Sequence, residues 1–396
     1  MKTNILVTGL VLATIGTVLV YPTLRGHATT PIRHTPIVLP PTAAKRVEVV
    51  FVLDTTGSMG GLIETAKEKI WSIASTLAQA HQVPEISMGL VAYRDHGDAY
   101  VTRVIDLDRD LDSMYAKLLG LAADGGGDGP EAVNEALEAA VERVSWSQDP
   151  GTYKVVFLVG DAPPHMDYNA AKYPEVVAAA AARGIVVNTI QCGGASETVA
   201  PWQQIAALGH GRYFTVEQAG GAVAIATPFD EQIATLAAQL DDTRLYYGSS
   251  DEVAQMADKV AATARLNEEA SLSARARRGV FNVSEAGAGN FFGGRELVDD
   301  IASGRVDLAA VPAAELPASI AAAPFVERQA MIEATAQKRE ELQLEIAKLG
   351  MERDAFIEAE VEKIGGVADS LDQQIYEAVR EQAADVGIVY DGGPKF

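Results

Sequence analysis

Short apolar runs alternate with longer amphipathic stretches over residues 46–242. The short runs are rich in β-branched residues and predict strands at 47–53, 86–93, 101–106, 155–159, 185–190 and 213–216. Apolar residues at helical spacing predict helices at 62–80, 111–121, 130–144, 175–183, 199–208 and 218–240. This alternation favours an α/β fold, a doubly wound and mostly parallel sheet with helices on both faces.

The remaining C-terminal residues follow a different pattern. Residues 243–324 are less periodic, with a helix expected at 252–270 and a glycine-rich loop at 282–294. Residues 325–385 read as long charged helices before a tail at 386–396. Their apolar positions are Ile346, Leu349, Phe356, Val361 and Ile364. This face either packs inside the chain as a helical hairpin or forms a coiled coil with another copy or with a partner protein. The heptad repeat is interrupted at Arg353.

The N-terminus has the features of an export signal. Lys2 precedes an apolar run at 5–20, and the small residues Gly26 and Ala28 follow. We expect a signal peptide at 1–28 and a proline-rich linker at 29–45. The run is short for a membrane span, which takes about 20 residues, but an uncleaved anchor is the alternative and the only expected contact with a membrane. Either reading places the rest of the chain in the periplasm or outside the cell.

Composition excludes several classes of partner. Lys and Arg number 32 and Asp and Glu 54, giving a formal net charge of −22. Such acidity argues against binding to nucleic acid or to anionic lipid. The one cysteine, Cys192, rules out an internal disulfide and is expected to be buried.

Oxygen-bearing side chains follow two of the predicted strands. Asp54, Thr56 and Ser58 come directly after strand 47–53, and Asp161 comes after strand 155–159. Between these two loops in the chain, the second loop, 124–131, carries Asp128 and leads into a helix. Ligands of open α/β sheets bind at the carboxyl ends of the strands, and hard divalent cations prefer oxygen ligands. These loops therefore predict an octahedral cation site at one edge of the sheet.

The D-x-T-x-S spacing of Asp54, Thr56 and Ser58, with the two later loops, resembles the von Willebrand factor A domain family over residues 46–242. The resemblance implies a metal-ion-dependent adhesion site. Asp54, Thr56, Ser58 and Asp161 match its ligand positions, and Mg²⁺ is the expected ion, with Mn²⁺ or Ca²⁺ as alternatives. The family's second-loop threonine falls on Asp128, and the surrounding GGGDxPE pattern fits an exported bacterial branch.

A carboxylate at Asp128 changes the expected chemistry. It neutralises more of the ion's charge, so the ion binds more tightly and attracts a partner's acid less. Alternatively, Asp128 only caps the helix predicted to begin at Pro130. The loop also resembles an EF-hand, with Asp124 and Glu135 at its first and last ligand positions, but Gly126 replaces the third-position ligand.

Three side chains are expected at the rim of the site, where a partner would bind: Arg94, His96 and His165. Arg94 would clamp a partner carboxylate or pair with Asp95 or Asp98. The predicted activity is cation-dependent, non-catalytic binding of a protein ligand through an acidic side chain, with the C-terminal helices as a route to homo-oligomers.

Two other functions stay open. The segment at Asp54 resembles the nucleophile loop of haloacid-dehalogenase-type phosphatases, and Asp161 their magnesium-binding loop. Thr56 replaces the aspartate that would protonate the leaving group, so turnover as a magnesium-dependent phosphohydrolase would be poor. The second alternative is a structural envelope scaffold whose role does not depend on metal.

Overall fold

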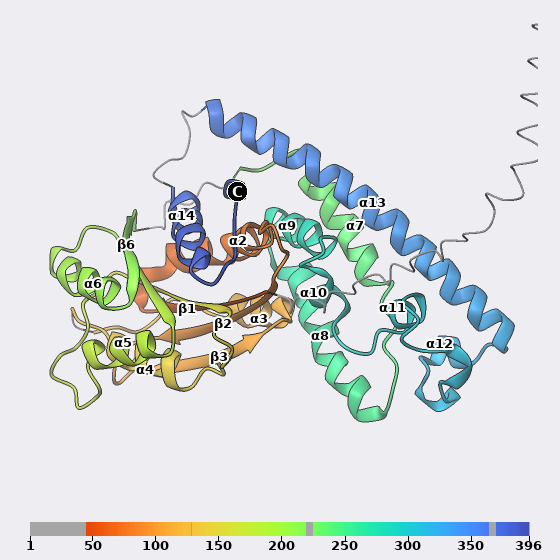
Figure 1. Ribbon diagram of the computed structural model, residues 1–396, viewed down its shortest axis with the longest axis horizontal. Coiled ribbons are helices and arrows are strands. Elements are labelled where there is room, and N and C mark those ends of the chain that lie inside the picture. The colour runs from red at the N-terminus through yellow and green to blue at the C-terminus, as the bar shows by residue number, and fades with distance from the viewer. Residues whose placement is uncertain (1–44, 128, 219–224, 364–369, 396) are drawn as a thin grey trace, which may run out of the picture. The chain divides into compact units, whose positions relative to one another are not determined.

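A six-stranded sheet forms the centre of the fold (Figure 1). The structure is a computed structural model, and it describes residues 45–395 except 128, 219–224 and 364–369. The strands are β1 (Arg46–Asp54), β2 (Glu85–Tyr93), β3 (Thr102–Asp108), β4 (Thr152–Gly160), β5 (Ile185–Cys192) and β6 (His210–Val216). Their order is β3-β2-β1-β4-β5-β6. All neighbours pair in parallel except β2 and β3, which are antiparallel. The predicted α/β fold is confirmed.

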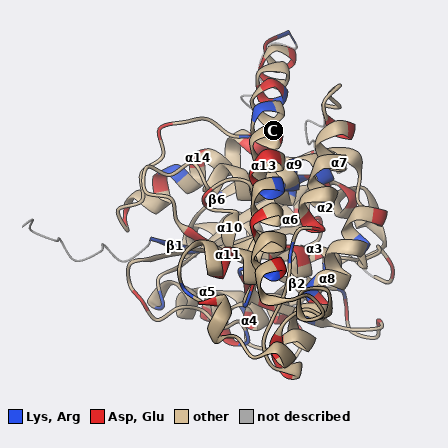
Figure 2. Cartoon of the chain, turned by 90° about the vertical axis from the view of Figure 1, so that its right-hand side faces the viewer, with Lys and Arg blue, Asp and Glu red and all other residues tan. Residues whose placement is uncertain are grey.

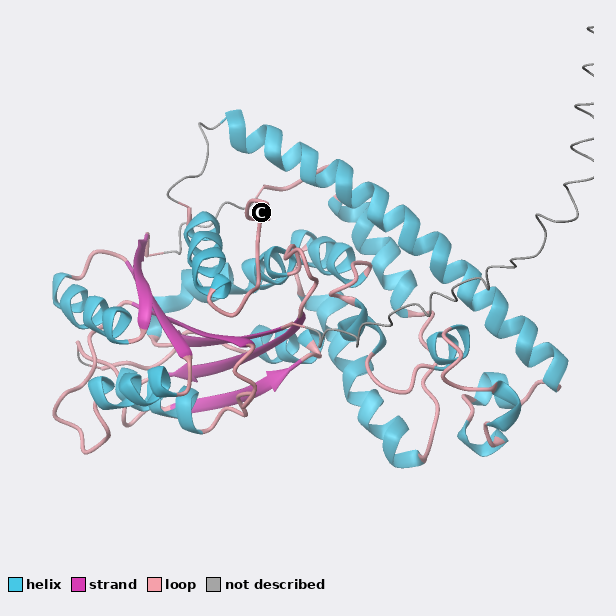
Figure 3. Cartoon of the chain, viewed as in Figure 1, coloured by secondary structure: helices cyan, strands magenta, loops and turns pink. Residues whose placement is uncertain are grey.

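Helices cover both faces of the sheet (Figure 3). One face carries α2 (Gly60–Leu77), α3 (Leu111–Leu119) and α14 (Leu371–Ala384), and a core that includes Phe51, Trp71 and Ile375. The other carries α4 (Val133–Glu142), α5 (Tyr173–Ala182) and α6 (Ser196–Leu208), with Val50, Leu137 and Val177 among its core residues. Burial on both faces explains why β1 and β4 are almost wholly apolar.

The other helices lie beside the sheet, where most of them share two further cores. They are α7 (Asp230–Asp241), α8 (Ser250–Glu269), α9 (Leu272–Asn282), α10 (Ala288–Phe292), α11 (Leu297–Ala302), α12 (Ala318–Ala321) and α13 (Phe325–Lys363). Short 3₁₀ turns are η2 (Gly57–Met59), η3 (Leu308–Ala310) and η4 (Ala313–Glu315). The long α13 packs against α7, α9, α11 and α12, and acidic and basic side chains alternate along its outer surface (Figure 2).

The predicted apolar face of α13 packs inside this chain. Ile346, Leu349 and Val361 are buried and Phe356 is half-buried, whereas Ile364 lies outside the described residues. Arg353, where the heptad is interrupted, is buried and pairs with Asp230 of α7 at 2.8 Å. The interruption is therefore the site of a buried ion pair. An oligomeric coiled coil remains a prediction.

Two helices begin later than the sequence predicts. The helix expected from 218 begins at Asp230, because Pro228 disfavours helical backbone at Thr227 and the Asp230 carboxylate accepts hydrogen bonds from the Thr227 amide and hydroxyl. The helix expected from Pro130 begins at Val133, because the Glu131 amide donates to the Pro163 carbonyl instead. The expected loop at 282–294 also contains α10.

The structure describes Cys192 but almost none of the predicted N-terminal segments. The expected signal peptide at 1–28 and nearly all of the expected linker at 29–45 lie outside the described residues. Within the part of the chain that is described, no helix combines the length and apolar character needed to cross a membrane. Cys192 is buried, as predicted, and burial raises the pKa of its thiol.

Candidate metal centre

Strand pairing brings the predicted loops to one edge of the sheet. Asp54 ends β1 and lies opposite Tyr93, the last residue of β2. On the other side of β1, Leu53 lies opposite Val159 of β4, so Asp161 follows one residue beyond the end of that strand. The carboxyl ends of three adjacent strands therefore meet here, as expected for a ligand site in an open α/β sheet.

Backbone hydrogen bonds tie the first loop to the second. The Gly57 amide donates to the Gly125 carbonyl at 3.1 Å, and the Asp124 amide donates to the Thr55 carbonyl at 3.1 Å. Gly125 and Gly126 have φ angles of +77° and +79°, a left-handed conformation that glycine adopts without steric strain. The glycine run thus lets the second loop lie directly against the first.

The first-loop side chains lie together as the D-x-T-x-S spacing requires. Asp54 is fully buried, and its Oδ1 accepts hydrogen bonds from the Thr56 amide at 2.9 Å and the Thr56 hydroxyl at 2.7 Å. The Ser58 hydroxyl lies 3.4 Å from the Thr56 hydroxyl, and Ser58 is exposed. Asp54 Oδ2 is buried and has no hydrogen-bond partner among the described atoms.

Glu131 borders the same space, although the sequence analysis gave it no role. A β-carbon at Gly126 would lie 3.0 Å from Glu131 Oε1 and 3.3 Å from Thr56 Cβ, so both side chains line this space. Glu131 is buried, and its Oε2 has no hydrogen-bond partner within the described part of the chain. Its position at the end of the GGGDxPE segment was the available signal.

Tyr93 also reaches the site from the end of β2. A β-carbon at Gly160 would overlap the Tyr93 hydroxyl and lie 3.1 Å from Asp54 Oδ2. The Tyr93 hydroxyl is buried without a hydrogen-bond partner among the described atoms. Glycine at 160 therefore leaves room for a tyrosine hydroxyl and a carboxylate at the end of β4.

Burial and mutual repulsion perturb the carboxylates. Burial, together with the charge of Asp161, raises the pKa of Asp54 to about 7, against hydrogen bonds from Thr56 that lower it. Burial also raises the pKa of Glu131 to about 8, with added repulsion from Asp54, Asp95, Asp98 and Asp161. The site thus concentrates negative charge in a poorly solvated place, which a bound cation would relieve.

Asp161 stands at the edge of this group. It is half-buried, and its Oδ2 accepts a hydrogen bond from Gln218 Nε2 at 2.7 Å. Its main-chain carbonyl accepts one from the Thr198 hydroxyl at 2.9 Å, which fixes the loop against α6. Asp128, the remaining predicted ligand, lies outside the described residues.

No trio of His, Cys, Asp or Glu side chains within the described ranges is placed to hold a metal ion. The predicted ligands that the structure describes are of two kinds. They are the carboxylates of Asp54 and Asp161 and the hydroxyls of Thr56 and Ser58. These oxygen atoms fit a hard divalent cation, and the unpartnered Oδ2 of Asp54 has the character of a ligand atom.

Arg94 does not lie on an open rim, contrary to expectation. It is 7% exposed and donates from Nε to the Thr55 carbonyl at 3.2 Å and from Nη2 to the Ala122 carbonyl at 2.9 Å. Its nearest acid is Asp124, at 3.4 Å, and not Asp95 or Asp98. Its guanidinium is used to brace the first loop against the second, so it is not available to clamp a partner carboxylate.

The two histidines differ in exposure. The His96 side chain is 47% exposed and pairs with Glu135 at 2.8 Å, and its place at the rim stays a prediction. His165 is buried, contacts Asp167 at 2.9 Å and Asp95 at 3.5 Å, and stacks on Tyr168. The predicted rim position of His165 is therefore wrong, because its backbone is drawn inward by the hydrogen bond from its amide to the Glu131 carbonyl.

Comparisons with known proteins agree with this domain. Residues 48–228 match the model of the von Willebrand factor A domain. The chain is 37% identical over 114 residues to von Willebrand factor A domain-containing protein 7 of Rattus norvegicus, covering 29% of this chain and 12% of that protein. It is 30% identical over 125 residues to alpha-protein kinase vwkA of Dictyostelium discoideum, covering 31% and 19%. The matched segment thus spans less than a fifth of these relatives.

Among solved structures, proximal thread matrix protein 1 from the mussel byssus, with a zinc-occupied MIDAS motif, is similar to this chain. It shares 17% sequence identity with a TM-score of 0.34, and the match covers 43% of this chain and 42% of that one. The family match over residues 48–228, together with the sheet described above, supports a von Willebrand factor A domain in this part of the chain.

Proposed function

We propose that this chain binds another protein through a divalent cation at the carboxyl edge of its sheet, without catalysis. The observation that carries the proposal is the fully buried Asp54 carboxylate, with one oxygen fixed by Thr56 and the other unpartnered among the described atoms. An ionised carboxylate left in this state would be strongly disfavoured. A cation supplies the missing partner.

Asp54, Thr56, Ser58 and Asp161 would hold the ion, directly or through water, with Mg²⁺ as the proposed ion and Mn²⁺ or Ca²⁺ as alternatives. When bound, the ion supplies a positive centre for an oxygen of the partner. The chain's own residues prepare the site: Thr56 orients Asp54, and Gly125 and Gly126 hold the second loop against the first. Exposed Ser58 and His96 lie where a partner would make contact.

Glu131 modifies this chemistry. Its carboxylate adds negative charge beside Thr56, so it strengthens the hold on the ion and weakens the ion's attraction for an acid of the partner. We therefore propose that contacts with the rim contribute more of the partner affinity than they would around a less acidic site. The partner is a protein ligand presenting an acidic side chain.

Full burial of Asp54 also supports a non-catalytic role. A phosphatase nucleophile must reach the phosphorus atom of its substrate, whereas Asp54 is 0% exposed and is already hydrogen-bonded to Thr56.

We propose export to the periplasm or the cell exterior on the N-terminal sequence alone. Fractionation of the full chain and of a variant lacking residues 2–28 tests this localisation.

The decisive experiment is a pull-down from envelope extract in Mg²⁺ buffer and with a chelator. We expect capture by the full chain to be lost with the chelator and with Ser58→Ala, and retained with the control Ser303→Ala, which removes an exposed serine hydroxyl on α11's C-terminal side. Capture that survives both the chelator and Ser58→Ala would support the metal-independent scaffold. Calorimetry with Mg²⁺ alone tests the ion site separately from the partner.

A further inference from the structure

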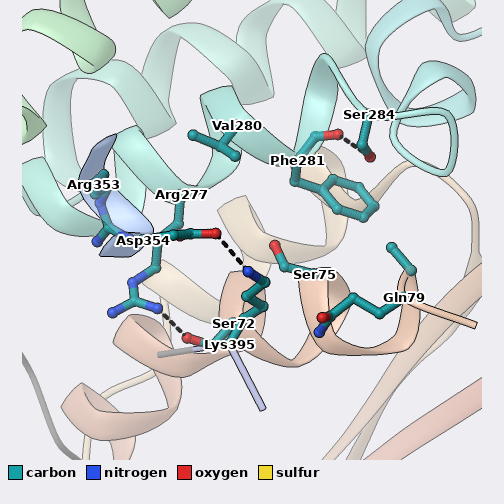
Figure 4. Close-up of a pocket in the computed structure, with 11 residues that line it drawn as sticks. Ser72, Ser75, Gln79, Arg277, Val280, Phe281, Ser284, Arg353, Asp354 and Lys395 are labelled. Atoms are coloured by element: carbon teal, nitrogen blue, oxygen red, sulfur yellow. Dashed lines mark hydrogen bonds and ion pairs between the residues drawn. The ribbon is translucent and has the colours of Figure 1, made fainter. Parts of the chain in front are cut away.

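A cavity of about 200 Å³ lies between the A domain and the helical region. Its walls come from α2, α9, α13 and Lys395, near the end of the sequence (Figure 4). Its nearest α2 residue, Ser72, is 12 residues beyond Gly60, where α2 begins. That corresponds to roughly 18 Å along the helix, so the cavity is separate from the proposed metal centre.

Arg277 lines this cavity as a buried cation without a carboxylate partner. It is 5% exposed, and its hydrogen bonds go to two neutral hydroxyls, Ser72 at 2.5 Å and Ser273 at 3.5 Å. No carboxylate of the described residues lies within ion-pair distance of it. By contrast, the buried Arg278, Arg339 and Arg353 each pair with an acid. An unpaired buried charge is normally unfavourable unless something compensates it.

Two further cations line the same cavity. Arg353 pairs with Asp230, and Lys395 pairs with Asp354 at 2.7 Å. Of the lining side chains, three are therefore basic and only Asp354 is acidic, in a chain with a net charge of −22. Burial lowers the pKa of Arg277 to about 10 and repulsion from Arg353 adds to the effect, whereas the charges of Asp372, Asp230 and Glu68 act against it. The guanidinium thus remains charged at neutral pH.

The lining also includes three apolar residues, Ala78, Val280 and Phe281. Figure 4 shows Phe281 on the side away from Arg277 and Arg353, with the polar side chains of Gln79 and Ser284 on the same side. The volume is more than ten times the roughly 10–15 Å³ that a cavity needs to hold one water. It would hold a compact molecule with a charged end and an apolar body.

We propose that this cavity binds a small organic anion, with its phosphate or carboxylate oxygens on Arg277 and its apolar part against Phe281. The guanidinium fork suits both kinds of oxyanion. Because the walls come from α2 of the A domain and from α9 and α13, such a ligand would contact both parts of the fold at once. The proposal does not depend on the metal centre.

The test uses the full chain with phenyl phosphate, benzoate, inorganic phosphate and neutral phenol as probes. We expect phenyl phosphate, benzoate or both to release or absorb heat in calorimetry and to raise Tm in proportion to concentration. Which of the two binds more tightly distinguishes phosphate from carboxylate recognition. Inorganic phosphate should bind at least tenfold more weakly than phenyl phosphate, and phenol should not bind.

Variants make the test specific to Arg277. Arg277→Met should abolish probe binding without lowering Tm in the absence of probe, since it removes an unpaired buried charge. Arg305→Met makes the same change of net charge at an exposed arginine and should bind normally. Ser75→Glu places a carboxylate inside the cavity and should raise Tm and block the probes, whereas neutral Ser75→Gln should not raise Tm.

Failure of both organic anions to bind, at concentrations up to the millimolar range, would overturn the proposal. Unchanged affinity in Arg277→Met would overturn it too. If Arg277→Met does not fold, Arg277→Lys decides the matter, because it keeps the charge but loses the fork: binding at least tenfold weaker is expected, and unchanged binding contradicts the proposal.

Discussion

The Arg278 guanidinium of α9 donates two hydrogen bonds to the Asp112 carboxylate of α3, from Nε at 2.7 Å and from Nη2 at 2.5 Å. Both side chains are buried, and Arg278 also donates to Asp241 of α7 at 2.8 and 2.9 Å. One arginine on α9 therefore joins α3, which covers the sheet, to α7. The ion network adds to apolar contact at the same junction, where Phe281 of α9 packs against Trp71 of α2.

Removing Arg278 should be strongly destabilising. Arg278→Met leaves Asp112 and Asp241 buried near each other without their shared cation, and breaking a buried pair in this way costs about 3–5 kcal/mol. Denaturant unfolding of the variant and the parent measures the change in the free energy of unfolding. Arg305→Met, at an exposed arginine paired with Asp299 and Asp300, is the control and should change that free energy by less than about 1 kcal/mol. Equal effects of the two substitutions would contradict the role of the network.

The same network predicts a loss of stability at low pH. Arg278 and Lys259 hold the pKa of Asp112 well below its usual range, against the effect of burial. A carboxyl whose pKa is lowered by folding contributes stability above its unfolded pKa, about 3.9, and that stability is lost as the pH falls toward the folded pKa. We expect Asp112→Asn to lower the free energy of unfolding at pH 7. Below about pH 4, that free energy should fall less steeply with falling pH in the variant than in the parent. A parallel pH profile of variant and parent would refute this.

The convergence of the first-loop side chains can be predicted from the sequence because its determinants are local. An apolar run fixes β1, and Asp54, Thr56 and Ser58 follow it directly, so their convergence needs only a tight loop. The position of Arg94 could not be read this way, since its partner Asp124 arrives on another loop. The same limit applies to α14, which covers the sheet although more than 300 residues separate Ile375 from Phe51 in the chain. Such contacts depend on tertiary packing, which periodicity alone does not encode.

Gly160 and Tyr93 should be energetically coupled. Gly160→Ala would place a β-carbon against the Tyr93 hydroxyl, and overpacking of this kind typically costs about 1–3 kcal/mol. Tyr93→Phe removes the clashing oxygen, which has no described hydrogen-bond partner, so it should be nearly neutral alone and should relieve the Gly160→Ala penalty. A double-mutant cycle of unfolding free energies measures the coupling. Additive effects would show that the two positions do not share this space.

Asp161→Ala should weaken the ion site while the fold is kept. Asp161 follows the end of β4 in a half-buried loop, and loops of this kind tolerate substitution better than core positions. Calorimetry with Mg²⁺ should show at least a tenfold loss of affinity, with an unchanged circular dichroism spectrum. Equal Mg²⁺ affinity in parent and variant would remove Asp161 from the ligand set.

Glu131→Gln separates ion binding from partner binding. The substitution removes a negative charge beside Thr56 while keeping the side chain's shape, so Mg²⁺ should bind several-fold more weakly. At saturating Mg²⁺, the side chains of the site would neutralise less of the ion's positive charge. We therefore expect more of an acidic partner to be captured. Glu138→Gln, at an exposed position on α4, makes the same charge change away from the site and should alter neither quantity. If Glu131→Gln lowers Mg²⁺ affinity and partner capture together, Glu131 only helps to hold the ion, and its proposed moderating effect on the partner is wrong.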